Sequence, residues 1–213
     1  ILHISDMHMI PGQQKKIDFM HSLAALEPDL VMNTGDNLSH VDGMGPLLEA
    51  LDPLMDFPGV FVPGSNCYFA PVFKNPARYL WQPRTPQMIE EGSRVALPIE
   101  RMHEAFESRG WTGLVNRYDT LNLKGLRLEF SGVDDPHLRY DEHPGFAPGA
   151  FDEGQEPSVR IGVAHAPYMR TLYRFVQDGA QAIFAGHTHG GQVCLPGGHA
   201  LVSNCDLPPS RAK

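Results

Sequence analysis

The sequence predicts an α/β fold with a largely parallel sheet. Short apolar runs alternate with helical patterns over the first 62 residues, and polar side chains that can bind metals follow several of the apolar runs. No apolar run is long enough to cross a bilayer, and the composition is that of a globular protein. We therefore expect one domain that covers residues 1–213, with a long loop or small insert at 68–97.

The first part of the chain alternates between strand and helix. In the first helical pattern, Ile17, Met20 and Ala24 recur on one helix face. Alternation of this kind is typical of parallel sheets, because a helix connects each pair of parallel strands. We expect strands at 1–5, 30–32 and 59–62, and helices at about 13–26 and 44–51.

The second part begins with a segment rich in proline and arginine, 68–97, which we interpret as the loop or insert. Pro98 opens the next helix, and Gly110 follows its end. The segments 117–122 and 126–131 then flank Leu123-Lys124-Gly125 and predict a β-hairpin. The remaining expectations are hairpin strands at 117–122 and 126–131, a loop at 143–156, a strand at 160–164, a helix at about 170–178 and a strand at 182–185.

Charge and cysteine content exclude several classes of protein. The formal net charge of −8 argues against a broad nucleic-acid interface. It does not exclude an anionic substrate, since bound divalent cations would reverse the sign inside one pocket. Cys67, Cys194 and Cys205 form an odd number without a C-x-x-C pair, which argues against a disulfide framework or a zinc knuckle. The sequence also lacks a P-loop, a dinucleotide-binding turn and the nucleophile elbow of serine hydrolases.

Two histidines, His187 and His189, follow the last apolar run and lie between glycines. In extended backbone they point to the same side, so one strand end offers two nitrogen ligands. Alone, this pair is equally consistent with a turn that carries two solvated histidines. Other strand ends carry matching residues, and open α/β sheets bind ligands beyond the carboxyl ends of their strands. The donors suit Mn²⁺, Fe²⁺ or Zn²⁺, and these further residues are Asp6, His8, Asp36, Asn66 and His165.

These motifs resemble the calcineurin-like metallophosphoesterases, whose pattern is D-x-H, G-D, G-N-H, an isolated H and G-H-x-H. The chain matches this order from residue 1 to about residue 196, and its runs G-S-N-x-Y-F-A-P and G-H-T-H-G-G-Q are similar to a bacterial branch that is often membrane-associated. The resemblance implies a four-layer α/β/β/α sandwich. We expect it to be truncated at both ends, because a strand pattern begins at the first residue and only a short tail, 193–213, follows the last motif.

The resemblance also implies a site with two divalent metal ions, Mn²⁺, Fe²⁺/Fe³⁺ or Zn²⁺. Asp36 would bridge the two ions, and a hydroxide between them would attack phosphorus in line with the leaving oxygen. Asp36, Asn66 and His165 would therefore serve catalysis as well as metal binding. Asp6, His8 and His189 would hold the first ion, and Asn66, His165 and His187 the second.

One position departs from the family pattern, since Cys67 stands where a histidine usually follows the asparagine. A neutral thiol is a poor general acid, and a proton donor is typically worth about 10²–10⁴-fold in rate. Three explanations stay open: a good leaving group, a slow enzyme, or a donor among His137, His143 and His199. Cys67 itself either lines the pocket, as a candidate catalytic and oxidation-sensitive residue, or fills semi-buried space.

Weaker signals accompany the motifs. Asn37 either supports the site by hydrogen bonding or only forms a turn. Asp134-Asp135-Pro136 is expected to start a helix or order a loop rather than to bind metal. Basic side chains around the expected insert either clamp a phosphate or are solvated, namely Lys74, Arg78, Arg84 and Arg94.

We therefore expect a binuclear phosphohydrolase that acts on small-molecule or lipid-linked phosphoesters, with phosphodiesters or pyrophosphates favoured over monoesters. A nucleic-acid partner is not expected. The alternatives are a metal-binding scaffold with little or no turnover and a metal-dependent nuclease. The compartment stays open between cytoplasm and membrane surface, and any membrane association would come through a segment outside this chain.

Overall fold

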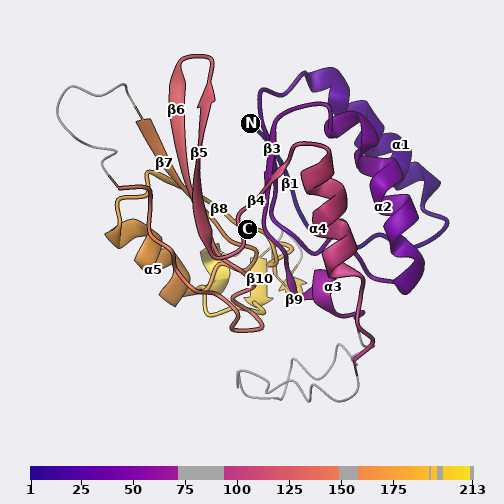
Figure 1. The fold of residues 1–213 in the computed structure, drawn as a ribbon. Helices are drawn as coiled ribbons and strands as arrows, with labels where there is room; N and C mark the ends of the chain where they lie inside the picture. Colours follow the sequence, from indigo (N-terminus) through magenta and orange to yellow (C-terminus); the bar gives the residue numbers. More distant parts are fainter. Residues whose placement is uncertain (72–93, 149–157, 192, 196–198, 212–213) are drawn as a thin grey trace.

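The computed structural model describes residues 1–71, 94–148, 158–191, 193–195 and 199–211. Two four-stranded sheets face each other, and helices cover the outer face of each sheet (Figure 1). This arrangement is the four-layer α/β/β/α sandwich that the sequence motifs imply. Within the described residues, no helix has the length and apolarity needed to cross a bilayer.

The first sheet is entirely parallel. Its strands, in spatial order, are β1 (Leu2–Ile4), β2 (Val31–Asn33), β3 (Gly59–Phe61) and β4 (Thr112–Gly113). The helices α1 (Gln14–Ser22), α2 (Met44–Leu51) and α4 (Ile99–Ser108) lie on its outer side (Figure 1). Short 3₁₀ turns at Leu23–Leu26, Val41–Gly43 and Asp52–Leu54 adjoin the first two helices.

The second sheet is mixed. Its order is β5 (Arg117–Leu123), β6 (Leu126–Gly132), β7 (Ser158–Val163) and β8 (Ala182–Phe184). β5 and β6 form the predicted antiparallel hairpin, and Lys124 and Gly125 both have positive φ, as a two-residue hairpin turn requires. β6, β7 and β8 are parallel, and α5 (Met169–Gln177) covers the outer face.

Apolar side chains fill the spaces between the layers. Met32 and Val60 of the first sheet pack with Phe130 and Ile161 of the second, so alternate residues of each strand face the partner sheet. The residues between them along the strands of the first sheet, such as Val31 and Phe61, pack against the helices α1, α2 and α4. The two sheets are therefore joined by a continuous apolar interface.

Most of the expected elements are present with boundaries shifted by at most four residues, and residues 149–156 of the expected loop at 143–156 lie outside the described part of the chain. The elements that were not expected include the two-residue strand β4, the single turn α3 (Ser65–Tyr68), and the antiparallel strands β9 (Val193–Leu195) and β10 (His199–Val202). The short tail at 193–213 therefore carries a strand pair that was not expected from the sequence. Phe69 and Ala96, near the two ends of the expected insert, form an antiparallel bridge. Residues 72–93 of the insert lie outside the described residues.

Candidate metal centre

The predicted ligand residues all follow strands at their carboxyl ends. Those from the first sheet come after β1, β2 and β3, and those from the second sheet come after β7 and β8. The two sheets meet at this edge, so side chains far apart in sequence lie together in two groups. The groups are Asp6, His8 and His189, and Asp36, His165 and His187.

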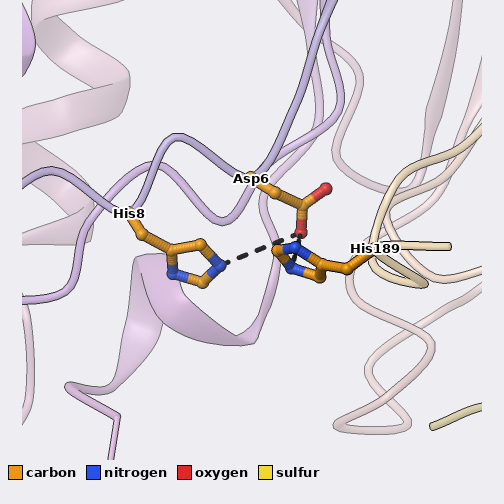
Figure 2. Close-up of side chains that lie close together, drawn as sticks. All are labelled: Asp6, His8 and His189. Carbon is orange, nitrogen blue, oxygen red and sulfur yellow. Dashed lines mark ion pairs between the residues drawn. The ribbon is translucent and has the colours of Figure 1, made fainter. Parts of the chain in front are cut away.

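The first group is partly open to solvent. Figure 2 shows the His8 and His189 rings directed toward the Asp6 carboxylate. The Oδ1 atom of Asp6 lies 3.2 Å from His189 Nε2 and 4.0 Å from His8 Nε2. Among the described residues this Oδ1 atom is buried and has no hydrogen-bond partner. An unsatisfied carboxylate oxygen facing two imidazole nitrogens fits a cation that would bind all three.

The second group is buried. His165 Nε2 lies 3.3 Å from Asp36 Oδ2 and 3.1 Å from His187 Nδ1. Asn66 joins this group, because its backbone N–H donates to Asp36 Oδ1 (2.7 Å) and its Nδ2 donates to Asp36 Oδ2 (2.9 Å). Its amide oxygen thus stays available as a ligand.

Asp36 connects the two groups. Its Oδ2 atom is also 3.9 Å from His8 Nε2 of the first group. A single carboxylate therefore lies within reach of both places where a cation would bind. This is the arrangement expected of a bridging ligand.

Hydrogen bonds on the far side of two rings orient the imidazoles. His165 Nδ1 donates to the backbone carbonyl of Thr34 (2.7 Å), and His8 Nδ1 contacts Ser39 Oγ (2.9 Å). Both contacts direct Nε2 toward the carboxylates, as is usual for histidines that bind metals. Thr34 and Ser39 were not expected from the sequence. Thr34 acts through its backbone carbonyl, which any residue would supply, so no sequence signal marks it.

Opposite charges on Asp36 and His165 attract each other across the two sheets. Burial alone would lower the pKa of His165, but the attraction of Asp36 outweighs it and raises that pKa to about 10. Burial would likewise raise the pKa of Asp36, yet the charge of His165 holds it below the usual range. Burial, together with the charge of His165, lowers the pKa of His187 to about 3, so this ring is neutral.

The carboxyl group of the first metal-binding group is ionised as well. Burial raises the pKa of Asp6, but the nearby His189 imidazole, 3.2 Å away, and the charge of His165 outweigh burial and lower the pKa to about 2. Two ionised carboxylates therefore lie among four imidazole rings. This donor set fits borderline divalent ions.

Five of the seven predicted ligand residues have a left-handed backbone. Positive φ is uncommon outside glycine and costs free energy. Here φ is positive at Asp6 (54°), His8 (46°), Asp36 (51°), His187 (70°) and His189 (51°). The expectation that His187 and His189 project from extended backbone toward one volume was wrong. Their left-handed turns send His187 into the buried group and His189 into the open group.

Glycine allows two turns to approach each other closely. A Cβ atom on Gly64 would lie 2.6 Å from the His165 ring and still closer to Asp36 Oδ1. Such contacts are not sterically tolerable, so only glycine permits this turn after β3 to lie beside His165.

Cys67 lies in the core and not in the pocket. Its side chain is fully buried, its Sγ accepts the backbone N–H of Asn37 (3.5 Å), and burial raises the pKa of the thiol to about 12. The expectation that Cys67 lines the pocket as a candidate catalytic residue is therefore wrong, and the space-filling interpretation agrees with the structure. The Asn37 side chain donates to Met102 Sδ (3.8 Å), so it supports the turn from the core side.

The other candidates take different positions. His137 lies with its ring 4.8 Å from that of His187, and its Nδ1 contacts the hydroxyl of Tyr168 (3.0 Å). His143 contacts Asp178 (2.7 Å), and the Arg94 guanidinium lies over the Phe69 ring. Lys74, Arg78, Arg84 and the side chain of His199 lie outside the described residues.

The Asp134-Asp135-Pro136 segment orders a loop, as expected. The Asp135 carboxylate accepts the backbone N–H groups of His137 and Leu138, each at 3.1 Å. Asp135 is fully buried, and burial raises its pKa to about 7. Neither Asp134 nor Asp135 belongs to the two metal-binding groups found among the described residues.

Two comparisons bear on the site. The sequence profile of the family described as calcineurin-like phosphoesterase matches residues 1–191. The chain is also similar to the uncharacterized protein YpbG of Bacillus subtilis (strain 168), with 29% identity over 93 residues. That match covers 44% of this chain and 34% of YpbG, so the chain spans about a third of the length of this relative.

Proposed function

The chain belongs to the calcineurin-like phosphoesterase family, a family of phosphoric ester hydrolases, and we propose that it hydrolyses phosphoesters with two divalent cations. The observation that carries the proposal is the placement of Asp36 between two groups of donors, one open and one buried. We assign Asp6, His8 and His189 to the first cation and Asn66, His165 and His187 to the second.

When bound, the cations would supply positive charge for the phosphate and acidify a water held between them. The residues of this chain do the rest. Ser39 and the Thr34 carbonyl hold the His8 and His165 rings with Nε2 inward, and burial of the second group excludes bulk water. The His189 and His8 side chains are 47% and 27% exposed, whereas His165 is not exposed at all. A substrate therefore approaches from the His8 and His189 side.

The favoured substrates are phosphodiesters or pyrophosphates, either small or lipid-linked. Cys67 replaces the usual imidazole and is a buried, protonated thiol, so it does not assist departure of a basic alkoxide. A pyrophosphate, which releases a phosphate, and a phosphodiester with a weakly basic leaving group both react without such assistance. The net charge of −8 argues against nucleic acid as the substrate.

The test compares wild type with Asp36→Asn in the presence of Mn²⁺. Substrates are bis-p-nitrophenyl phosphate, p-nitrophenyl phosphate, a pyrophosphate diester and a nuclease substrate, and Asp42→Asn is the control at an exposed carboxylate. We expect Asp36→Asn to lower turnover by about 100-fold or more, since it removes the ligand shared by both cations. Asp42→Asn should have no effect.

Two results would contradict the proposal. One is hydrolysis that survives Asp36→Asn unchanged. The other is wild-type protein that binds two equivalents of Mn²⁺ and cleaves none of the substrates, which would favour a metal-binding scaffold. Cleavage of the nuclease substrate in preference to the others would favour the nuclease alternative.

A further inference from the structure

The turn that carries Asn66 cannot hold its own shape. α3 is a single turn of four residues, and Asn66 within it departs from helical geometry (φ −88°, ψ 22°). Isolated helices this short are not stable, because nucleation costs more than one turn of hydrogen bonds returns. Contacts outside α3 must therefore fix the position of Asn66.

Contacts at both ends hold this turn. Near its start, Asn66 donates twice to Asp36. At its end, the hydroxyl of Tyr68 lies 2.8 Å from both carboxylate oxygens of Asp134, and the Tyr68 ring packs edge-on against Tyr140. Asp134 is only 8% exposed, so the hydroxyl provides a hydrogen bond that water cannot readily replace.

Asp134 is itself firmly placed. Its backbone N–H donates to Asn116 Oδ1 (2.8 Å), and its Oδ1 accepts the backbone N–H of Asp135 (2.7 Å). Asp134 follows β6 in the second sheet, whereas Tyr68 follows β3 in the first sheet. The contact between them therefore crosses from one sheet to the other beside the candidate metal centre.

We propose that Tyr68 and Asp134 form a positioning clamp that holds Asn66 in place as a ligand of the second cation. Tyr68 is a positioning residue here and not a catalytic one. The inference rests on the proposed function, because it takes Asn66 as a ligand. The first cation shares only Asp36 with this clamp, since Asp6 is fixed by Ser5 (2.6 Å) and by the backbone N–H of His187 (2.9 Å).

The test is Tyr68→Phe, which removes the hydroxyl and keeps the ring against Tyr140. Tyr173→Phe, at an exposed position of α5 (61%), is the matched control. Metal-free proteins are titrated with Mn²⁺ by equilibrium dialysis. We expect Tyr68→Phe to weaken binding of the second equivalent by about 10- to 100-fold, as for other residues that orient a metal ligand. The first equivalent should weaken less, because that cation shares only Asp36 with the clamp. Tyr173→Phe should bind both equivalents like wild type.

The acceptor side gives a second measurement. Asp134→Asn keeps an oxygen that can accept the Tyr68 hydroxyl, so its second equivalent should weaken less than in Asp134→Ala. This pair also supplies the answer if Tyr68→Phe fails to fold. Unchanged binding of both equivalents in Tyr68→Phe, or equal weakening of both, would overturn the clamp.

The titration does not depend on turnover. Wild-type protein that binds two equivalents without hydrolysis would contradict the proposed function alone, whereas the clamp is judged only by the difference between the two equivalents.

Discussion

Cys67 fills a narrow space between two turns of the candidate metal centre. Its Sγ accepts the N–H of Asn37 in the turn after β2, and its own N–H donates to the carbonyl of Gly64 after β3 (2.8 Å). The residue next to Asn66 thus joins two ligand-bearing turns from the core side. A small, polarizable side chain suits such a site.

This burial predicts that Cys67 is chemically inert in the folded protein. The thiolate is the reactive form, and the thiol has a pKa of about 12 and no exposure. Native protein treated with iodoacetamide at pH 8 should therefore carry no label on Cys67, whereas the partly exposed Cys205 should be labelled. Peptide mass spectrometry measures both, and urea-unfolded protein is the control in which Cys67 reacts. Labelling of Cys67 at the rate of Cys205 would contradict its placement in the core.

At the scale of elements, α5 supports the strand that leads to His165. Phe175 of α5 is fully buried and lies against Gly162 of β7. A Cβ atom on Gly162 would come within 2.7 Å of the Phe175 ring. The opposite face of the same helix is exposed, with Tyr173 at 61%. The helix therefore holds β7 through one face, and β7 carries His165 at its end.

Phe175→Ala should lower the free energy of unfolding by about 3–5 kcal/mol, because a buried aromatic ring leaves a cavity. Tyr173→Ala on the exposed face should change it by about 0.5 kcal/mol or less. Urea unfolding measures both variants. Equal effects of the two substitutions would show that α5 does not pack on β7 as described.

At the scale of the whole molecule, Asp36 and His165 join the two sheets by an ion pair. Because its pKa rises from 6.5 to about 10, folded His165 keeps a proton that the unfolded chain releases. Its stabilising contribution is complete below pH 6.5 and is lost as the pH rises through about 10. Mn²⁺ would take the place of that proton and remove the dependence.

The melting temperature of metal-free protein should therefore fall as the pH is raised from 6.5 to about 10. Asp36→Asn should flatten this decline, since the ion pair is then absent, and Asp42→Asn should retain it. Saturating Mn²⁺ should raise the melting temperature and also flatten the decline. Calorimetry across this pH range measures all four samples. A decline of equal slope in Asp36→Asn would assign the pH dependence to other groups.

Much of this architecture could be predicted from the sequence, because the spacing of apolar residues in strongly periodic segments, such as the helix at 44–51, indicates their secondary structure. The short strand β4 and the single turn α3 could not, since two to four residues carry no periodicity. The grouping of the ligand residues came from motif resemblance. The burial of Cys67 and the left-handed turns at His187 and His189 depend on tertiary contacts between residues far apart in sequence, which no local pattern reveals.

The left-handed backbone at the ligand positions makes metal binding and backbone stability conflict. An aspartate or histidine held at positive φ is strained, and glycine would relieve that strain at the same place. A chain that had glycine in place of His8 or His189 would lose a metal ligand but would relieve the backbone strain at that position. Selection for stability of the metal-free fold alone would therefore remove His8 and His189 first, because they are the most solvent-exposed histidines of this centre.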